Sequence, residues 1–271
     1  MTKRVVVISD TQLPYHDPRA LKNVISFVGD YQPDAVYQIG DLVDYPTPSR
    51  WNKNTRGEFE QRVVEDSEYT KRNFLAPLRK VYDGPLGVLE GNHDLRPRQY
   101  LAENAPALAE FSDAFHFKSL LDFDGFGVDL TPSFHKVGPD TVLIHGHEIK
   151  GMSNIAGTTA YNHARKAGAN VVMGHTHRLG IRRETAGNVH TGSTMRWGFE
   201  VGALMDPKKA QYLGVGGVCN WQMGFGLLYC GKYDVSPVAV DVRRDGSFVV
   251  EGERYGVIRR TASGHFAKAG K

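Results

Sequence analysis

Short apolar runs recur along the first two thirds of the chain, and polar or turn-forming residues bound each of them. Runs of this length with many β-branched residues are typical of strands that are covered on both faces. Buried strands are therefore predicted at residues 5–8, 35–39, 86–89, 141–144 and 171–173.

The segments between these strands carry the pattern of amphipathic helices. Asp17 is a suitable N-cap, because Pro follows it at the first helical position and apolar residues then recur at helical spacing. A second helical stretch is predicted over residues 55–82, where Pro77 should kink or divide it. A third is predicted over residues 153–167, with Ser153 as its N-cap.

The last third of the chain contains consecutive short strands, predicted at residues 180–184, 188–191, 226–230, 238–242 and 248–251. Alternating strands and helices followed by strands alone indicate two packed mixed β-sheets flanked by helices, an α/β/β/α sandwich. We expect one domain over residues 1–253, followed by a basic C-terminal tail over residues 254–271.

The composition is that of a globular protein: 271 residues, of which 41% are hydrophobic and 23% charged. A core of this size needs no structural metal, so a metal site would be functional. The net charge of +3 is too small to indicate a nucleic-acid-binding protein by itself, but it is compatible with an anionic substrate. The basic tail is either a solvated terminus or a segment that attracts phosphate-bearing ligands.

Cys219 and Cys230 form no metal-binding pair and are expected to be the thiols of a cytosolic protein. The apolar run near the N-terminus is too short for a signal peptide, and no stretch approaches the roughly 20 apolar residues of a membrane span. We therefore expect a cytoplasmic protein without a membrane partner.

The five predicted strands of the first two thirds end in polar residues of only a few kinds. These are Asp10 and Gln12; Asp41 and Asp44; Asn92, His93 and Asp94; His145 and His147; and His175 and His177. Carboxylate, amide and imidazole groups bind divalent metals, and sites commonly lie at the carboxyl ends of strands. One such fragment is weak evidence, because His-x-His can be a polar pair and Gly-Asn-His-Asp a turn. The ordered set indicates a centre for two metal ions.

This ordered set resembles the calcineurin-like metallophosphoesterases. The family pattern is Asp-x-His, Gly-Asp-x-x-Asp, Gly-Asn-His-Asp or -Glu, a strand-end His, and Gly-His-x-His. The corresponding motifs here begin at Asp10, Gly40, Gly91, His145 and Gly174, and the resemblance runs over residues 5–178. Residues 220–226 also resemble shorter members from bacteria and their phages, for which the cytoplasm would be that of the host.

The resemblance implies a dinuclear phosphoesterase in which a metal-bridging hydroxide attacks phosphorus. It implies one bridging ligand, Asp41, and two further groups of ligands: Asp10, Gln12 and His177 in the first site, and Asn92, His145 and His175 in the second. His93 would donate a proton to the leaving oxygen, and Asp44 would orient it. This fits general chemistry, because a bound metal lowers the pKa of water to about 7 and a cationic His helps an alkoxide leave.

The first motif departs from the family pattern, because Gln12 stands where the family has His. An amide oxygen is a neutral and harder ligand than imidazole, so the two divalent ions are expected to be Mn²⁺ first, with Mg²⁺, Zn²⁺ or Fe as alternatives. His16 either substitutes for the missing imidazole or is an ordinary loop residue.

The second motif departs too, because Tyr45 follows Asp44 where protein phosphatases of the family have a phosphate-binding Arg. This argues against a phosphoprotein phosphatase. Candidates for the missing contact with substrate are Arg50, Trp51, Arg178 and Arg196. His147 either supports a metal ligand or is exposed.

The function that we favour is hydrolysis of small nucleotide-type phosphodiesters, including cyclic nucleotides, because no region remains for a large substrate-recognition domain. A DNA or RNA nuclease of the break-repair type is the alternative, and it would need a basic track along the nucleic acid. A phosphomonoesterase and a non-catalytic scaffold are further alternatives. The oligomeric state is left open.

Overall fold

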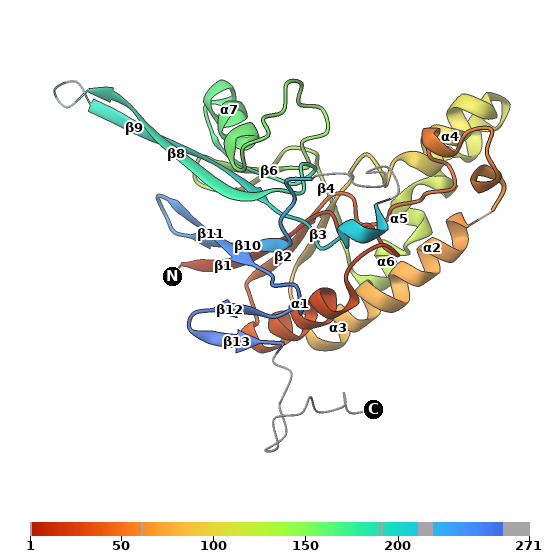
Figure 1. Ribbon diagram of the computed structural model, residues 1–271, viewed down its shortest axis with the longest axis horizontal. Helices are drawn as coiled ribbons and strands as arrows, with labels where there is room; N and C mark the ends of the chain where they lie inside the picture. Colours follow the sequence, from red (N-terminus) through yellow and green to blue (C-terminus); the bar gives the residue numbers. More distant parts are fainter. Residues whose placement is uncertain (1, 61, 189, 191, 211–218, 257–271) are drawn as a thin grey trace, which may run out of the picture.

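The computed structural model describes residues 2–60, 62–188, 190, 192–210 and 219–256, which form two mixed β-sheets packed face to face between helices (Figure 1). The larger sheet has the strand order β11-β10-β1-β2-β3-β4, in which β1 to β4 are parallel. Its strands are β1 (Lys3–Ile8), β2 (Ala35–Ile39), β3 (Leu86–Leu89), β4 (Asp129–Thr131), β10 (Gly224–Cys230) and β11 (Val235–Asp241).

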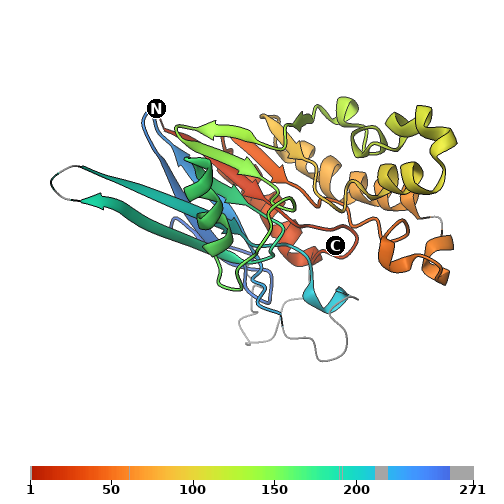
Figure 2. The same ribbon diagram turned by 90° about the horizontal axis from the view of Figure 1, so that it is seen from above.

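The second sheet has the strand order β5-β6-β7-β9-β8, with β6, β7 and β9 parallel to one another. Its strands are β5 (His135–Gly138), β6 (Thr141–Ile144), β7 (Asn170–Met173), β8 (Leu179–Asn188) and β9 (Gly192–Val201). The outer parts of β8 and β9 are exposed, and this hairpin projects away from the rest of the molecule (Figures 1 and 2).

Helices cover the outer face of each sheet, so the predicted α/β/β/α sandwich is confirmed. On the larger sheet lie α1 (Pro18–Tyr31), α2 (Val63–Thr70), the π-helical η3 (Lys71–Leu75), α3 (Ala76–Val81), α5 (Phe117–Leu120) and α6 (Phe123–Phe126). On the second sheet lies α7 (Thr158–Ala167). The remaining elements are α4 (Arg96–Asn104), the 3₁₀ segments η1 (Arg50–Asn52), η2 (Arg56–Phe59), η4 (Pro106–Phe115) and η5 (Pro207–Lys209), and the hairpin of β12 (Phe248–Val250) and β13 (Glu253–Tyr255).

Strand β1 shows why the sheets pack on both faces. Side chains alternate along a strand, so Val5 and Val7 enter the apolar cluster between the sheets, whereas Val6 and Ile8 enter the cluster beneath the helices. Phe199 of β9 belongs to the cluster between the sheets and is fully buried. A strand that is buried on both faces has no polar position to reveal its period, which is why it appears in the sequence as one apolar run.

The predicted helix over residues 55–82 is divided. The chain passes through η2, α2 and η3 before α3 begins, and Pro77 lies in the first turn of α3. At the junction the Ala76 N–H bonds the Lys71 carbonyl five residues back, which is the pattern of a π-helical turn. Pro77 is accommodated there because residues in a first helical turn need no partner for their N–H.

Two further boundaries differ from the prediction. Helix α7 begins at Thr158 and not near Ser153, because Gly157 adopts a left-handed conformation at the N-cap and the Ser153 hydroxyl accepts instead from Ile155 N–H at 3.1 Å. Of the strand predicted at residues 188–191, Asn188 ends β8 and residue 190 lies in a turn, whereas residues 189 and 191 lie outside the described residues.

The predicted start of the C-terminal tail falls inside β13. Arg254 pairs with Val249 of β12, and the Tyr255 ring stacks on Phe248 with centroids 5.4 Å apart. The remainder of the predicted tail, residues 257–271, lies outside the described residues. Within the described part of the chain, no helix is long and apolar enough to cross a membrane.

Candidate metal centre

The polar ends of five strands meet at one edge of the molecule. Strands β1, β2 and β3 of the larger sheet and β6 and β7 of the second sheet all end there, as parallel strands within each sheet must. The site residues that follow them are Asp10, Asp41, Asn92, His145 and His175. The polar ends of these five strands therefore converge, as predicted from the sequence.

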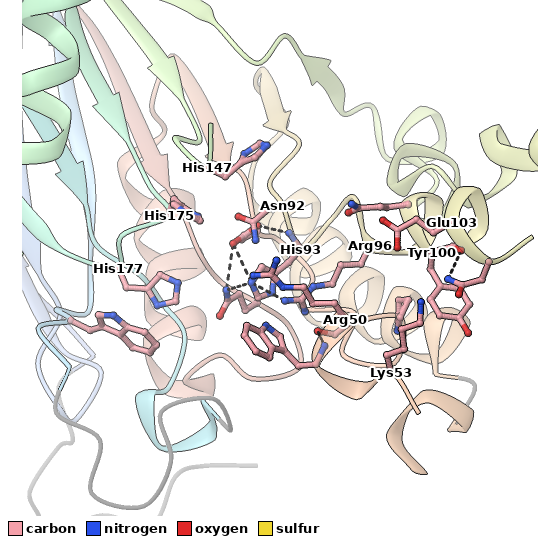
Figure 3. Close-up of a pocket in the computed structure, with 18 residues that line it drawn as sticks. Arg50, Lys53, Asn92, His93, Arg96, Tyr100, Glu103, His147, His175 and His177 are labelled. Atoms are coloured by element: carbon pink, nitrogen blue, oxygen red, sulfur yellow. Dashed lines mark hydrogen bonds and ion pairs between the residues drawn. The ribbon is translucent and has the colours of Figure 1, made fainter. Parts of the chain in front are cut away.

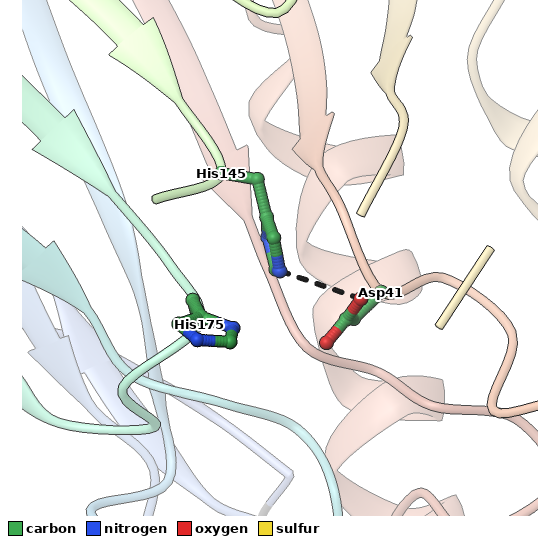
Figure 4. A group of neighbouring side chains, drawn as sticks. All are labelled: Asp41, His145 and His175. Atoms are coloured by element: carbon green, nitrogen blue, oxygen red, sulfur yellow. Dashed lines mark ion pairs between the residues drawn. The ribbon is translucent and has the colours of Figure 1, made fainter. Parts of the chain in front are cut away.

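Asp41, His145 and His175 form the tightest group (Figure 4). Their ligand atoms all lie within 4.8 Å of one another, and His145 Nε2 is 3.3 Å from Asp41 Oδ1. His145 Nδ1–H donates to the Ile39 carbonyl at 2.9 Å, which turns Nε2 toward the other two residues. An imidazole held in one tautomer by a backbone carbonyl is the usual arrangement of a metal-binding His.

The charges in this group depend on one another. Burial disfavours the cation, but the Asp41 carboxylate outweighs it and raises the pKa of His145 to about 10. Burial opposes ionisation of Asp41 as well, yet His145 and His93 hold its pKa well below the usual value. Burial and the nearby His145 charge lower the pKa of His175 to about 4. The His175 ring is therefore neutral at physiological pH and keeps a lone pair that can bind a metal.

Asp10, Gln12 and His177 lie beside this group. His177 Nε2 is 3.2 Å from Asp10 Oδ1, while Asp10 Oδ2 accepts from the Ser9 hydroxyl at 2.5 Å and from His175 N–H at 2.8 Å. Gln12 Nε2 is 3.4 Å from Asp41 Oδ2. The amide side chain of Gln12 thus lies beside Asp41.

The donor atoms of this site fit a divalent metal centre. Buried polar atoms in proteins nearly always have a hydrogen-bond partner. Among the described residues, four buried polar atoms at the site have none: Gln12 Oε1, His147 Nδ1, His175 Nδ1 and His177 Nδ1. Asp10 Oδ1 faces only His177 Nε2, at 3.2 Å. A set of carboxylate, amide and imidazole donors that converge in this way is what a pair of borderline divalent ions requires.

Backbone conformation places several of these side chains. Positive φ angles are found at Asp10 (49°), Gln12 (46°), Asp41 (54°), His175 (64°) and His177 (56°). Non-glycine residues rarely adopt this left-handed conformation, and they concentrate at functional sites. The loops are also closely packed: a Cβ on Gly91 would overlap the backbone nitrogen of Asp41, and one on Gly174 would overlap the Ser9 hydroxyl.

His93 lies next to the cluster and is oriented by Asp44. Its Nδ1 is 2.7 Å from Asp44 Oδ1, so Nε2 is left for the pocket, and its backbone N–H donates to Asp41 Oδ1 at 2.9 Å. Burial disfavours the imidazolium, but the charges of Asp41 and Asp44 raise the pKa of His93. Asp94 is wholly buried beneath and accepts from the backbone N–H groups of Val43 and Gly91 at 2.9 Å, which ties two loops together.

Sequence reasoning missed two polar residues of the site. Arg96, at the start of α4, lies with one terminal nitrogen 3.1 Å from His93 Nε2 and the other 2.6 Å from the Asp44 carbonyl. Glu200, fully buried on β9, accepts from the Thr176 hydroxyl at 2.8 Å and from Thr159 N–H of α7 at 2.9 Å. Glu200 therefore fixes the loop between His175 and His177. Neither residue stands in a motif, so no local pattern pointed to them.

A pocket of about 680 Å³ opens from the cluster and runs between α4 and η1 (Figure 3). Its inner end is formed by Gln12, Asp41, Asn92, His93, His147, His175 and His177, and its outer walls carry Arg50, Trp51, Lys53, Arg96, Tyr100, Glu103 and Trp221. Trp221 packs against His177 with ring centroids 4.2 Å apart.

The predicted substrate contacts divide into two groups. Arg50, Trp51 and His147 line the pocket, whereas Arg178 and Arg196 do not. Arg178 donates to Asn154 Oδ1 at 3.2 Å, and Arg196 pairs with Asp140 at 3.7 Å. On β9, Gly198 pairs with Val171 of β7, and Arg196 lies two residues before Gly198. Arg196 is therefore toward the amino ends of these parallel strands, whereas the site lies at their carboxyl ends. His16, the alternative to Gln12, does not line the pocket either.

Comparison with known proteins places this geometry in a family. A profile of the calcineurin-like phosphoesterase family matches residues 3–192. The chain belongs to the calcineurin-like phosphoesterase family. Its members have dinuclear metal centres and act on phosphate esters, so the chain is a metal-dependent phosphoric ester hydrolase.

Two relatives are phage proteins. The Gene 54 protein of Mycobacterium phage L5 is 51% identical over 254 residues, which cover 93% of this chain and 98% of that protein. The Gene 54 protein of Mycobacterium phage D29 is 52% identical over the same length and coverage. Among solved structures, Vps29 from Entamoeba histolytica is 16% identical (TM-score 0.42; 93% of this chain, 97% of that one). The phosphoesterase Yfce from E. coli is 14% identical (TM-score 0.37; 87% and 98%).

Proposed function

We propose that this phosphoesterase hydrolyses phosphodiester bonds in small nucleotide-type substrates, cyclic nucleotides among them, with two Mn²⁺ ions and with His93 as general acid. The observation that carries the proposal is the set of unpartnered buried donors beside the His93–Asp44 pair, at the inner end of one pocket.

Seven residues would hold the metals. Asp41 is central, with its two oxygens directed to different neighbours, which supports its role as the shared ligand. Asp10, Gln12 and His177 lie on one side of it, and Asn92, His145 and His175 on the other. When bound, the ions supply Lewis acidity and a nucleophilic water at neutral pH. Gln12 contributes a hard amide oxygen, which favours Mn²⁺ over softer metals.

His93 is placed to protonate the leaving oxygen. Asp44 accepts the Nδ1 proton at 2.7 Å and stabilises the imidazolium, whose second proton would lie on Nε2 in place of the hydrogen bond that Nε2 makes with Arg96 Nη2 at 3.1 Å. Nε2 faces the pocket, and the ring is 10% exposed, so a bound ester can reach it. An alkoxide is a strong base, and a proton donor of this kind contributes typically 10²–10⁴-fold to the rate.

The pocket favours a nucleotide-sized ligand. Its volume of about 680 Å³ lies within the range of small-molecule sites. Trp51 is 68% exposed at its mouth, and the Arg50 guanidinium lies 4.9 Å from the Trp51 ring centroid. An exposed indole beside cations is suited to stacking on a base while the phosphate is bound nearby.

A phosphoprotein phosphatase is disfavoured for a structural reason. Tyr45 occupies the position where those enzymes carry an Arg, and its side chain is fully buried, with its hydroxyl 2.8 Å from Ser67 Oγ. A residue that points into the core at this place makes no contact with a phosphate. Because two relatives are phage proteins, we place the activity in the cytoplasm of an infected host.

The test is a substrate panel on purified protein loaded with Mn²⁺, with metal content measured on the same preparation. The panel holds a phosphomonoester, a linear diester, 2′,3′- and 3′,5′-cyclic nucleotides, and single-stranded DNA and RNA. We expect the small diesters to be cleaved fastest. Asp41→Asn should abolish turnover and lower the metal content, whereas Asp140→Asn, at a carboxyl that is 77% exposed and far from the pocket, should change neither.

Three outcomes would contradict the proposal. Preference for single-stranded nucleic acid, with a rate that falls steeply with salt, would identify a nuclease. Preference for the monoester would identify a phosphatase. Absence of turnover with two metals bound would identify a scaffold.

A further inference from the structure

Arg96 contacts both members of the His93–Asp44 pair. Its Nη1 donates to the Asp44 carbonyl at 2.6 Å and lies 3.4 Å from Asp44 Oδ2. Its Nη2 lies 3.1 Å from His93 Nε2, at the wall of the pocket. The side chain is only 16% exposed. The guanidinium is therefore a fixed cation, because Asp44 anchors one nitrogen and directs the other toward the place where His93 acts.

The position of Nη2 matters because of the atom it faces. His93 Nε2 is the atom that gives a proton to the leaving oxygen in the proposed function, on which this inference rests. Once Nε2 carries a proton, the N–H groups of Nη2 and Nε2 can no longer bond each other. An oxygen bound to Nε2 then lies within reach of Nη2 as well, because the two nitrogens are 3.1 Å apart. We propose that Arg96 is a catalytic residue, which donates a hydrogen bond to the leaving-group oxygen together with His93.

The chemical step then involves two donors with different tasks. Water adds to phosphorus, and the bond between phosphorus and the leaving oxygen breaks with its electron pair on that oxygen. The proton from His93 Nε2 forms the alcohol, and the proton released by water returns to His93 through solvent. Arg96 keeps all its protons, since a guanidinium does not deprotonate in proteins, and stabilises the negative charge that develops before proton transfer is complete.

The alternative is that Arg96 only positions Asp44. Both roles act on the leaving oxygen, so what separates them is the effect of replacing Arg96 when His93 is absent. A donor on the leaving oxygen matters most when that oxygen is strongly basic, as in an alkyl or phenyl ester, and little when it is stabilised, as in a nitrophenyl ester. A residue that only positions Asp44 would affect the rate through His93 alone, so its replacement would have no further effect on kcat once His93 is replaced.

The experiment measures kcat and KM for thymidine 5′-phosphate diesters of p-nitrophenol, phenol and methanol, in order of rising leaving-group pKa, with Mn²⁺. The variants are Arg96→Met, Arg96→Lys, His93→Asn and the double variant of Arg96→Met with His93→Asn. Arg98→Lys is the matched control, because Arg98 is on the same helix but pairs with Glu90 at 2.8 Å and does not line the pocket.

We expect Arg96→Met to reduce kcat by less than about 10-fold for the nitrophenyl ester and by about 100-fold or more for the other two, with KM little changed. Arg96→Lys should fall between Arg96→Met and wild type, and Arg98→Lys should match wild type. The double variant should be slower than His93→Asn alone, because in His93→Asn the Arg96 side chain still donates to the leaving oxygen and in the double variant it is absent.

Three results would overturn the assignment of Arg96. These are an equal loss for all three esters, a loss confined to KM, and a double variant no slower than His93→Asn. They are distinct from failure of the proposed function, which would appear as absence of diester hydrolysis by the wild-type protein itself. Thermal unfolding of each variant identifies any that lose activity by unfolding, and Arg96→Lys keeps the test valid if Arg96→Met does not fold.

Discussion

Asp66 of α2 has a buried carboxyl group whose charge is hardly offset by hydrogen bonds or ion pairs, and its replacement by Asn should stabilise the protein. The side chain is 1% exposed, Oδ2 has no hydrogen-bond partner, and its ion pair with Arg62 is long at 3.9 Å. Burial raises the pKa of Asp66 from 3.8 to about 7. The carboxylate form is thus the unfavourable one in the folded state, and Asn has nearly the same shape without the charge.

The size of the effect follows from linkage between ionisation and folding. The folded protein holds the Asp66 proton more tightly than the unfolded chain does, so wild-type stability falls as pH rises between about 4 and 7. A rise of about 3 pKa units corresponds to at most about 4 kcal/mol once both states are ionised. Asn still buries an amide, so we expect Asp66→Asn to gain roughly 2–4 kcal/mol at pH 8 and close to nothing at pH 4.

Urea unfolding of wild type and Asp66→Asn at several pH values between 4 and 8 measures this difference. Other titrating groups cancel because both proteins carry them. Asp140→Asn, at a carboxyl that is 77% exposed, is the control and should shift stability by less than about 0.5 kcal/mol at every pH. The reasoning is refuted if Asp66→Asn is no more stable than wild type at pH 8, or if its gain is the same at pH 4 and pH 8.

Three further predictions concern the site. His93→Asn should keep its bound metal by elemental analysis while losing about 10²–10⁴-fold in kcat on an alkyl diester, and a parallel loss of metal would contradict the assignment of His93 as general acid. Glu200→Ala, which leaves three buried donors without an acceptor, should cost about 3–5 kcal/mol in urea unfolding, and Glu200→Gln at most about 2; equal costs would rule out the capping role. Mn²⁺ at 100 times its Kd should stabilise the protein by about 2.7 kcal/mol, seen as a higher Tm, and Asp41→Asn should show little of this shift.

The sequence could predict the strands that lead into the site and the residues that follow them. These strands are largely buried on both faces and mostly apolar, with Gln38 as an exception, so the polar residue that follows each of them stands out. Residues 35–39, 86–89 and 141–144 were predicted with the bounds that the structure has. Asp10, Asp41 and His145 could be found in this way before any coordinates were known.

Other features depend on tertiary contacts that leave no local pattern. The outer half of β9 is exposed and the inner half buried, so this strand has neither a continuous apolar run nor a clean alternation, and Glu200 was missed with it. Arg96 meets His93 only because α4 begins three residues after it. A π-helical turn joins α2 to α3, and the periodicity of residues 55–82 gave no sign of it.

The left-handed backbone at Asp10, Gln12, Asp41, His175 and His177 restricts how such a site can drift over evolutionary time. A residue there must satisfy the loop as well as the ligand field, and this conformation costs an ordinary side chain about 1–2 kcal/mol. Asn, Asp and His tolerate it better than most, and β-branched residues tolerate it worst. Few residue types therefore satisfy both requirements. In the role that we propose for Gln12, Gln in place of His keeps an unbranched Cβ and changes the atom that would bind the metal.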